Sequence, residues 1–236
     1  MIKKLAYIAI SSLLIVSCQE ILFSDLEVTR DIPLENFHSV QISGIFNIVF
    51  IQDSVNRLVI SGKNSVNSIG AEVINDTLKI EDSKAITINT EKNTLYLHFR
   101  ELEYIATNDP VNFSNEDTIK ARNLSFEATG EISEGTMTVD CEYLTVVNSD
   151  NTLGYMRFYG KSDYCTICNR YGAVVFADSL SCINADVTNE SVGDVYVNPS
   201  QSLNAFIRSS GNIYYYGNPV VTISEKRGNG NVIKRN

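Results

Sequence analysis

A repeat of about twenty residues between Leu102 and Pro219 constrains the fold of this chain more than any other feature of its sequence. Apolar or aromatic anchor residues recur at spacings of 22, 20, 20, 19 and 20 residues: Leu102, Leu124, Leu144, Tyr164, Ile183 and Leu203. A fixed period of this length is typical of solenoids, in which each copy buries its apolar side chains against its neighbours. Alternation of side chains within each copy indicates short strands. The repeat therefore predicts an all-β solenoid.

Alternation along a strand assigns each side chain to the inside or the outside of the coil. We place the anchors inside, together with the residues two positions after them: Tyr104, Phe126, Val146, Thr166, Ala185 and Ala205. The residues that follow these point outward in one column: Ile105, Glu127, Val147, Ile167, Asp186 and Phe206. The natural arrangement is a parallel β-helix with rungs about 4.8 Å apart. An antiparallel sandwich is the alternative, because periodicity does not reveal strand direction.

The first seventeen residues have the features of an export signal. Two lysines precede a largely apolar run of twelve residues, Leu5–Val16, which is too short to span a bilayer. The run ends in Ile15–Cys18, which resembles a bacterial lipobox. We predict that residues 1–17 are a lipoprotein signal peptide and that Cys18 carries the lipid. An ordinary export signal that happens to contain a cysteine is the alternative.

Lipid on Cys18 predicts that the mature protein is anchored to a membrane, since acyl chains bury apolar carbon in the bilayer. Gln19, rather than an aspartate, follows the cysteine, which fits the outer membrane or surface of a Gram-negative cell envelope. The next residues show no periodicity, so we interpret residues 18–32 as a tether and residues 33–232 as one domain.

Net charge argues against nucleic acid as a partner. Removal of the signal peptide takes away Lys3 and Lys4, which leaves 17 basic and 28 acidic residues and a formal net charge of −11. A nucleic-acid-binding protein normally presents a basic surface.

Strands are expected upstream of the repeat as well, continuous with the coil. Alternating apolar residues begin at Phe37, and the turn at Asn75–Thr77 separates two short apolar runs, which is typical of a hairpin.

Two blocks of sequence resemble the auto-transporter adhesin head GIN domain family of bacterial envelope proteins. The opening block comprises Phe37–Gly44, Ile45–Ile51, Leu58–Gly62 and Thr77–Ile80. The closing block comprises Leu203–Ala205, Ser210–Ile213, Tyr216–Pro219 and Gly228–Asn231. The resemblance covers roughly residues 33 to 232. It implies a right-handed parallel β-helix and a cell-envelope location, and it brings no catalytic motif.

The cysteines of the repeat are Cys141, Cys165, Cys168 and Cys182. The spacing of Cys165 and Cys168 matches half of a redox or zinc site, but alternation directs Cys165 outward and Cys168 inward. No column places two cysteines in successive rungs. We therefore interpret all four as free, buried or half-buried thiols and predict no metal and no cofactor.

A β-helix can carry polysaccharide-cleaving chemistry, which normally needs paired carboxyl groups. Glu127 and Asp186 share the outward column but lie three rungs apart, roughly 14 Å at the strand spacing. Glycosidase carboxyl groups are about 5–9.5 Å apart. The pair does not fit, so we expect no enzyme and name no catalytic residue.

Two groups of residues are candidate binding surfaces. The outward apolar residues Ile105, Val147, Ile167 and Phe206 would form a stripe along the coil, which is either covered or binds a partner. The run Tyr214, Tyr215 and Tyr216 would lie in the last recognisable rung, where it caps the coil or contacts a protein or glycan.

The sequence as a whole predicts a lipid-anchored, non-catalytic binding or structural module of the cell envelope, resembling an adhesin. An envelope protein or a glycan is the expected partner, and a homo-oligomer is also compatible with the stripe. The alternative is a carbohydrate-active enzyme or a glycan-binding protein on a β-helix scaffold.

Cys18→Ala is predicted to release the protein from membranes while leaving the domain folded, because residues 18–30 contribute no packing period. Metabolic labelling with a fatty acid analogue, followed by membrane fractionation, measures this. Label on the Ala variant, or none on the wild type, would reject the assignment.

Overall fold

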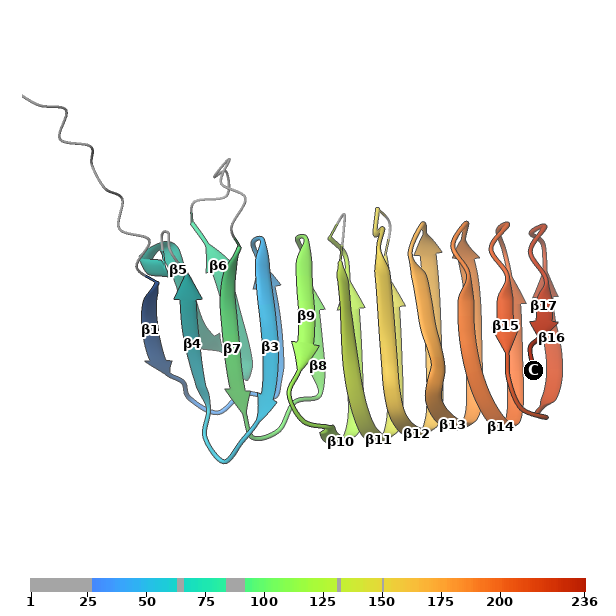
Figure 1. Ribbon diagram of the computed structural model, residues 1–236, viewed down its shortest axis with the longest axis horizontal. Helices are drawn as coiled ribbons and strands as arrows, with labels where there is room; N and C mark the ends of the chain where they lie inside the picture. The colour runs from blue at the N-terminus through green and yellow to red at the C-terminus, as the bar shows by residue number, and fades with distance from the viewer. Residues whose placement is uncertain (1–26, 63–65, 84–91, 131–132, 150) are drawn as a thin grey trace, which may run out of the picture.

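The chain forms a parallel β-helix, as the repeat predicted (Figure 1). The computed structural model describes residues 27–62, 66–83, 92–130, 133–149 and 151–236. All strands of the described residues belong to one continuous hydrogen-bonded sheet that winds around a single apolar core. Among the described residues, no helix is long and apolar enough to cross a membrane.

The strands follow one another closely along the chain, with one 3-10 turn, η1 (Val66–Ser68), before β5. They are β1 (Val28–Pro33), β2 (Ser39–Ser43), β3 (Phe46–Gln52), β4 (Arg57–Gly62), β5 (Ile69–Ile74), β6 (Thr77–Asp82), β7 (Asn93–Phe99), β8 (Tyr104–Thr107), β9 (Val111–Asn115), β10 (Ile119–Ala128), β11 (Glu134–Asn148), β12 (Tyr155–Tyr171), β13 (Val174–Ser191), β14 (Val195–Ile207), β15 (Ile213–Tyr215), β16 (Val220–Lys226) and β17 (Val232–Lys234).

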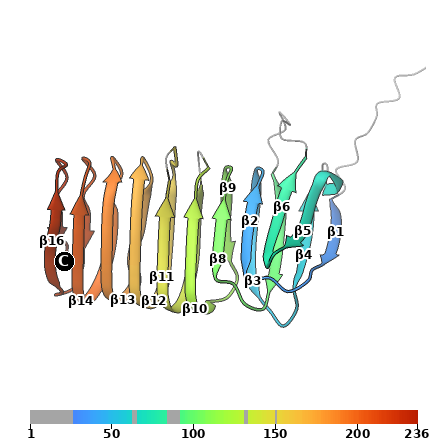
Figure 2. The ribbon, with the colours of Figure 1, turned by 180° about the vertical axis from the view of Figure 1, so that it is seen from behind.

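The coil has two broad faces. The front face, toward the viewer in Figure 1, contains β3, β9, β15, β17 and the first halves of β11 to β14. The back face, seen in Figure 2, contains β2, β8, β16 and the second halves of β10 to β14. The long strands β11 to β14 bend at a corner and so contribute to both faces. Pairing between successive rungs is parallel throughout this region.

Aligned apolar columns fill the interior. On the back face the register stacks Phe126 on Val146, Ile167, Val187 and Ala205, all with no exposed surface. Complete burial of an aliphatic side chain contributes about 1.5–3 kcal/mol to folding. Inward side chains of neighbouring rungs cover one another, so the register between rungs decides whether each of them is buried.

The predicted register is correct in the second, third and sixth rungs and wrong in the first and fourth. In the fifth rung it is correct for Ala185, but the anchor Ile183, which we placed inside, is 36% exposed. Ile105 and Ile167, which we placed outside, are fully buried, whereas Tyr104 and Thr166 point outward. The anchor Tyr164 is 48% exposed and the small Cys165 takes its place inside. The apolar stripe expected on the outer surface therefore does not exist, because half of it is core.

Corners explain the error. At each corner two successive residues point outward, so inward residues are three positions apart instead of two, as in Cys141 and Leu144 or Ser162 and Cys165. The Ser162 hydroxyl donates a hydrogen bond to the Tyr164 carbonyl (2.8 Å) and stabilises one of these bends. A bulky residue such as Tyr164 at the corner resembles a core anchor in the sequence, although its side chain faces solvent.

Buried asparagines stabilise the tight turns between the back and the front face. The amide of Asn148 donates to Asn169 (2.9 Å), and that of Asn169 to Asn189 (3.3 Å). Asn169 also donates to the turn carbonyl of Ala173 (2.8 Å), and Asn189 donates to that of Gly193 (3.0 Å). Backbone carbonyl groups buried in these turns thereby obtain hydrogen-bond partners. Without partners, their burial would cost free energy.

The amino-terminal end is closed by strands that depart from sequence order. β2 and β3 stack between the later rung β8–β9 and the rung β6–β7. Antiparallel strands then cover the end, with β4 on β7, β1 on β4 and β5 on β6. The predicted hairpin at β5–β6 is confirmed, with Asn75 and Asp76 at φ 48° and 64°. The end of the segment interpreted as a tether belongs to β1, because its backbone pairs with β4.

Ile167→Lys and Thr166→Lys distinguish the observed register from the predicted one. Ile167→Lys should lower the free energy of unfolding by several kcal/mol, because it buries an unpaired charge. Thr166→Lys should change the free energy of unfolding by less than about 0.5 kcal/mol, since the new ammonium group would lie outside, beside Asp186 in the next rung. Thermal melts measure both, and a larger loss for the Thr166 variant would contradict the register.

Candidate binding face

An aromatic column runs along the front face of the coil. The register pairs Arg157 with Phe176, Phe176 with Tyr196 and Tyr196 with Tyr214. The ring centroids of Phe176 and Tyr196 are 4.9 Å apart with planes at 13°, and those of Tyr196 and Tyr214 are 4.8 Å apart at 18°. The rings therefore lie almost parallel at the spacing of the rungs.

A guanidinium group covers each end of this column. The Cζ atom of Arg157 lies 4.1 Å from the centroid of Phe176, and that of Arg235 lies 4.4 Å from the centroid of Tyr214. Cations over aromatic faces are attracted by the ring quadrupole. Burial, followed by the negative charge of Asp194, raises the pKa of the Tyr196 hydroxyl. The faces of these three rings are occupied by their neighbours, so the column itself is a stabilising element.

Tyr155 lies beside the column and differs from its members. Its ring centroid is 6.4 Å from that of Phe176, with planes at 30°, and the residue is 54% exposed. It comes from the start of β12, one register position before Met156, which is buried. Tyr155 is therefore an aromatic ring on the outer surface that its neighbours leave largely uncovered.

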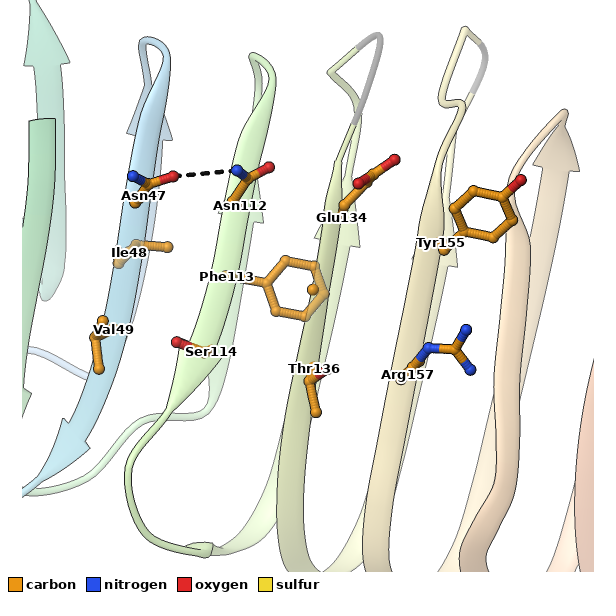
Figure 3. Close-up of a pocket in the computed structure, with 11 residues that line it drawn as sticks. Asn47, Ile48, Val49, Asn112, Phe113, Ser114, Glu134, Thr136, Tyr155 and Arg157 are labelled. Carbon is orange, nitrogen blue, oxygen red and sulfur yellow. Dashed lines mark hydrogen bonds between the residues drawn. The ribbon is translucent and has the colours of Figure 1, made fainter. Parts of the chain in front are cut away.

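A shallow groove of about 560 Å³ begins at Tyr155 and crosses the front face to β3 (Figure 3). Its lining comes from four neighbouring strands, β3, β9, β11 and β12. The outward polar residues of this lining are Asn47, Asn112, Ser114, Glu134, Thr136 and Arg157. Figure 3 shows Tyr155 and Arg157 at one end of the groove and the Asn47–Asn112 pair at the other.

Hydrogen bonding within the groove uses little of its polar capacity. Asn112 Nδ2 donates to Asn47 Oδ1 (3.1 Å). No other hydrogen bond of these two amides, or of the Ser114 and Thr136 hydroxyls, occurs within the part of the chain that the structure describes. Glu134 and Arg157 add one charge of each sign. The groove thus offers donors and acceptors together with one aromatic surface.

Gly135 makes room for the Phe113 ring beneath the groove. A Cβ atom on this residue would lie 2.1 Å from the Phe113 carbonyl oxygen and 2.6 Å from the Phe113 ring. Any side chain at this position would displace the neighbouring rung. The glycine therefore lets Phe113 fill the core beneath the groove (Figure 3).

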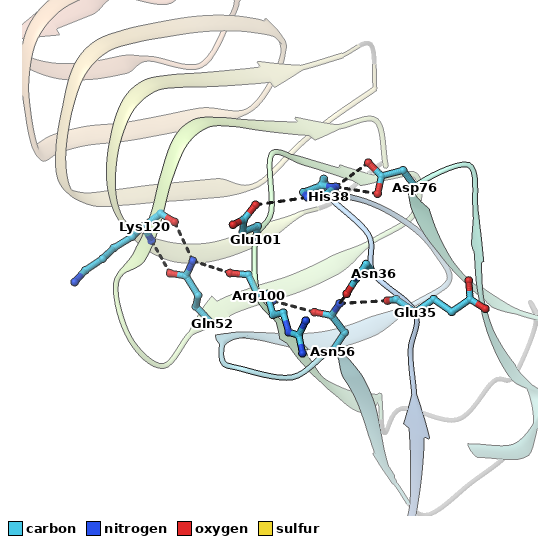
Figure 4. A network of polar contacts seen from close by, with 9 residues as sticks. All are labelled: Glu35, Asn36, His38, Gln52, Asn56, Asp76, Arg100, Glu101 and Lys120. Carbon is cyan, nitrogen blue, oxygen red and sulfur yellow. Dashed lines mark hydrogen bonds and ion pairs between the residues drawn. The ribbon is translucent and has the colours of Figure 1, made fainter.

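A second hollow, of about 630 Å³, lies at the corner between the two faces. Its polar groups already hold the chain together (Figure 4). Gln52 Nε2 donates to the carbonyls of Arg100 (3.2 Å) and Lys120 (2.9 Å), and Gln52 Oε1 accepts from the Lys120 backbone N–H (2.8 Å). Nearby, His38 lies 2.9 Å from Asp76, whose hydrogen bond raises the pKa of the imidazole. We interpret this region as structural.

The structure does not bring the residues predicted to form binding surfaces together in the way that the sequence suggested. Ile105 and Ile167 lie in the core, and Val147 and Phe206 are half-buried on the back face. Of the tyrosine run, Tyr214 belongs to the aromatic column, while Tyr215 packs against the core. Tyr216 is half-buried. This rung is followed by β16 and β17, so the run does not lie in the last rung.

The cysteines are free, as predicted, but the orientations of two of them are reversed. Cys165 is buried, and its burial raises the pKa of the thiol well above the usual value. Cys168 is half-buried on the outer side. Burial raises the pKa of Cys182 to about 12 and also raises that of Cys141. Among the described residues, no three His, Cys, Asp or Glu side chains are placed to hold a metal ion.

The two carboxylates considered for catalysis are not in one column, contrary to the predicted register. Glu127 aligns with Val147 and Cys168, whereas Asp186 aligns with Thr166 and Thr145. Glu127 accepts a short hydrogen bond from the Tyr104 hydroxyl (2.5 Å). Burial and this carboxylate raise the pKa of Tyr104 to about 12.

The sequence-based predictions included neither the front-face groove nor the aromatic column beside it, although the sequence contains a signal for the column. Phe176, Tyr196 and Tyr214 recur at spacings of 20 and 18 residues, which match the repeat. The aromatic column could have been found from that spacing. The groove could not, because half of its polar residues come from β3 and β9. β3 lies beside β9 only through the non-sequential stacking at the amino-terminal end.

Tyr196→Ala should lower the free energy of unfolding by at least about 1–3 kcal/mol, because two stacked pairs are lost at about 0.5–1.5 kcal/mol each in addition to buried area. Tyr196→Phe keeps both pairs and serves as the control. Chemical denaturation compares the two variants. Equal stabilities would show that stacking in this column does not stabilise the coil.

Comparisons with known proteins agree with the fold. A putative adhesin from Bacteroides fragilis superposes with a TM-score of 0.80 at 22% identity, covering 90% of this chain and 98% of that one. A putative adhesin from Parabacteroides distasonis gives 0.69 at 15% identity, with 90% and 98% covered. A putative lipid binding protein from the same species gives 0.65 at 18% identity, with 89% and 97% covered. At these identities the likeness shows a shared fold.

Among curated proteins, none has a sequence that matches this chain. The profile of one family, described as "Putative auto-transporter adhesin, head GIN domain", matches residues 36–219. The match includes the strands of the groove and the aromatic column and spans most of the sequence. The protein therefore belongs to the head GIN domain family of putative auto-transporter adhesins.

Proposed function

We propose that the protein is a lipid-anchored, non-catalytic binding module of the bacterial cell envelope and that it binds its partner in the front-face groove. One observation carries the proposal: the groove joins amide and hydroxyl side chains to the exposed ring of Tyr155. Binding sites generally combine a concave surface with a few convergent polar groups.

Rigidity of the scaffold supports a binding role. The groove residues lie on four hydrogen-bonded strands rather than on loops, and the side chains beneath them, such as Phe113 and Met156, are buried. A site on regular strands needs little reordering when a partner binds, which saves conformational entropy. Family membership and the names of the two putative adhesins among the structural relatives also support a binding role.

Attachment to the envelope follows from the predicted signal peptide and from Cys18, which lie outside the described residues. Lipid on Cys18 would hold the domain at the membrane surface, where it would meet a partner outside the membrane. The excess of acidic residues disfavours close contact with an anionic lipid surface. We infer an outer-membrane or cell-surface location in a Gram-negative bacterium.

A carbohydrate-active enzyme is the alternative. Glu127 and Asp186 are in separate columns on the back face, and Glu127 is already bonded to Tyr104. Neither residue lies in the groove. We therefore favour binding without catalysis.

Thr136→Arg is expected to weaken binding at least tenfold, because an arginine would fill the groove. Thr145→Arg is the matched control: both threonines are half-buried, outward residues of β11, but Thr145 lies on the back face. The chain from residue 18 with Cys18→Ala would be titrated onto surfaces coated with mucin, fibronectin or collagen. We expect saturable binding to at least one surface. Absence of binding, or equal effects of the two substitutions, would refute the proposal.

A further inference from the structure

We propose that the front-face groove binds a neutral glycan chain lying along the axis of the coil, with Tyr155 as its stacking platform. The inference rests on the proposed binding function and names the class of ligand. Four features of the groove carry it: the exposed ring, the amide and hydroxyl side chains of the lining, the spacing of the rungs and the balance of charge.

Tyr155 has the ring surface that a sugar needs. The apolar face of a pyranose packs against an exposed aromatic ring, and a tyrosine also keeps a polar end in water. Phe176 and Tyr214 do not qualify, because Arg157 and Arg235 cover their outer faces. Tyr155 is 54% exposed and belongs to the lining of the groove.

The rest of the lining suits hydroxyl groups. Amides and hydroxyls both donate and accept hydrogen bonds, as sugar hydroxyls do. Only one bond, from Asn112 to Asn47, is made between lining side chains in the described part of the chain. In Figure 3, Ser114 lies below Asn112 on β9, and Thr136 lies on β11, the strand between β9 and that of Tyr155. A chain of sugar rings would therefore meet polar groups along the whole groove.

Rung spacing matches the ligand in length. Neighbouring strands are about 4.8 Å apart, so the four strands of the groove extend over roughly 14 Å along the axis. One pyranose in an extended chain advances by a distance similar to the spacing between neighbouring rungs, so each sugar ring would meet one rung. The volume of about 560 Å³ is in the range of small-ligand sites.

Charge favours a neutral glycan over an acidic one. Glu134 and Arg157 are the charged residues of the groove, and their signs cancel. Arg157 is held over Phe176, so its N–H groups form a fixed set of donors at the Tyr155 end. The chain as a whole carries a formal net charge of −9, which repels polyanions at long range.

Affinity electrophoresis tests the inference with the chain from residue 18 carrying Cys18→Ala. Native gels would contain one polysaccharide each: galactomannan, glucomannan, hydroxyethylcellulose or xylan as neutral probes, and alginate or polygalacturonate as acidic ones. We expect retardation in at least one neutral gel and none in the acidic gels. Tyr155→Ala and Asn112→Ala should each weaken that retardation at least tenfold.

Tyr164→Ala is the matched control. Tyr164 is also an exposed tyrosine of β12 and stacks on an aromatic residue of the preceding rung, Tyr143, with centroids 5.1 Å apart, but it lies outside the groove. This variant should be retarded like the wild type. Thermal melts would verify that the Tyr155 variant is folded, and a folded variant retarded as strongly as the wild type would refute the platform.

Failure of the glycan inference can be separated from failure of the binding function. If no neutral gel retards the protein, or only acidic gels do, the ligand class is wrong. The mucin and fibronectin surfaces would then be oxidised with periodate, which destroys vicinal diols of sugars. Binding that survives oxidation and still depends on Thr136 would leave the binding function standing with a protein partner. Absence of binding to every surface would remove both proposals.

Discussion

Parallel pairing of successive rungs is the interaction on which the rest of the structure depends. A single rung encloses too small an interior to bury its own inward side chains, so these are buried only when the rungs on either side cover them. The in-register column from Phe126 to Ala205 shows the consequence, since every member is fully buried. A slip of one residue in any rung would exchange core and surface over that rung.

The same register that buries apolar side chains also aligns polar and aromatic ones. Asn148, Asn169 and Asn189 form a buried amide chain because they occupy one inward column. Phe176, Tyr196 and Tyr214 stack because they occupy one outward column. Outward columns are not needed for the core, so they can present different side chains at fixed spacing. The front-face groove is such a place, and its polar lining and the Tyr155 ring are held at rung spacing by the backbone.

The period and the fold class were predictable from the sequence, whereas the side-chain register was predictable only in part. The twenty-residue repeat and the hairpin at Asn75 and Asp76 follow from local pattern and are confirmed. The corners could not be located from the sequence, because the two successive outward residues at a corner resemble a continuation of the strand. Tyr164 consequently looked like an anchor, and Cys165 and Ile167 received the wrong face. The groove needed long-range information, since β3 reaches β9 only after β4 to β8 have been placed elsewhere.

Hydrogen–deuterium exchange locates ligand contact directly on the coil. The measurement would compare the chain from residue 18 carrying Cys18→Ala with and without a neutral polysaccharide that retards it. Binding in the groove predicts slower exchange in β3, β9 and the first halves of β11 and β12, with the back-face strands β2, β8 and β16 unchanged. Slower exchange confined to the back face, or to the two ends of the coil, would contradict a front-face binding site.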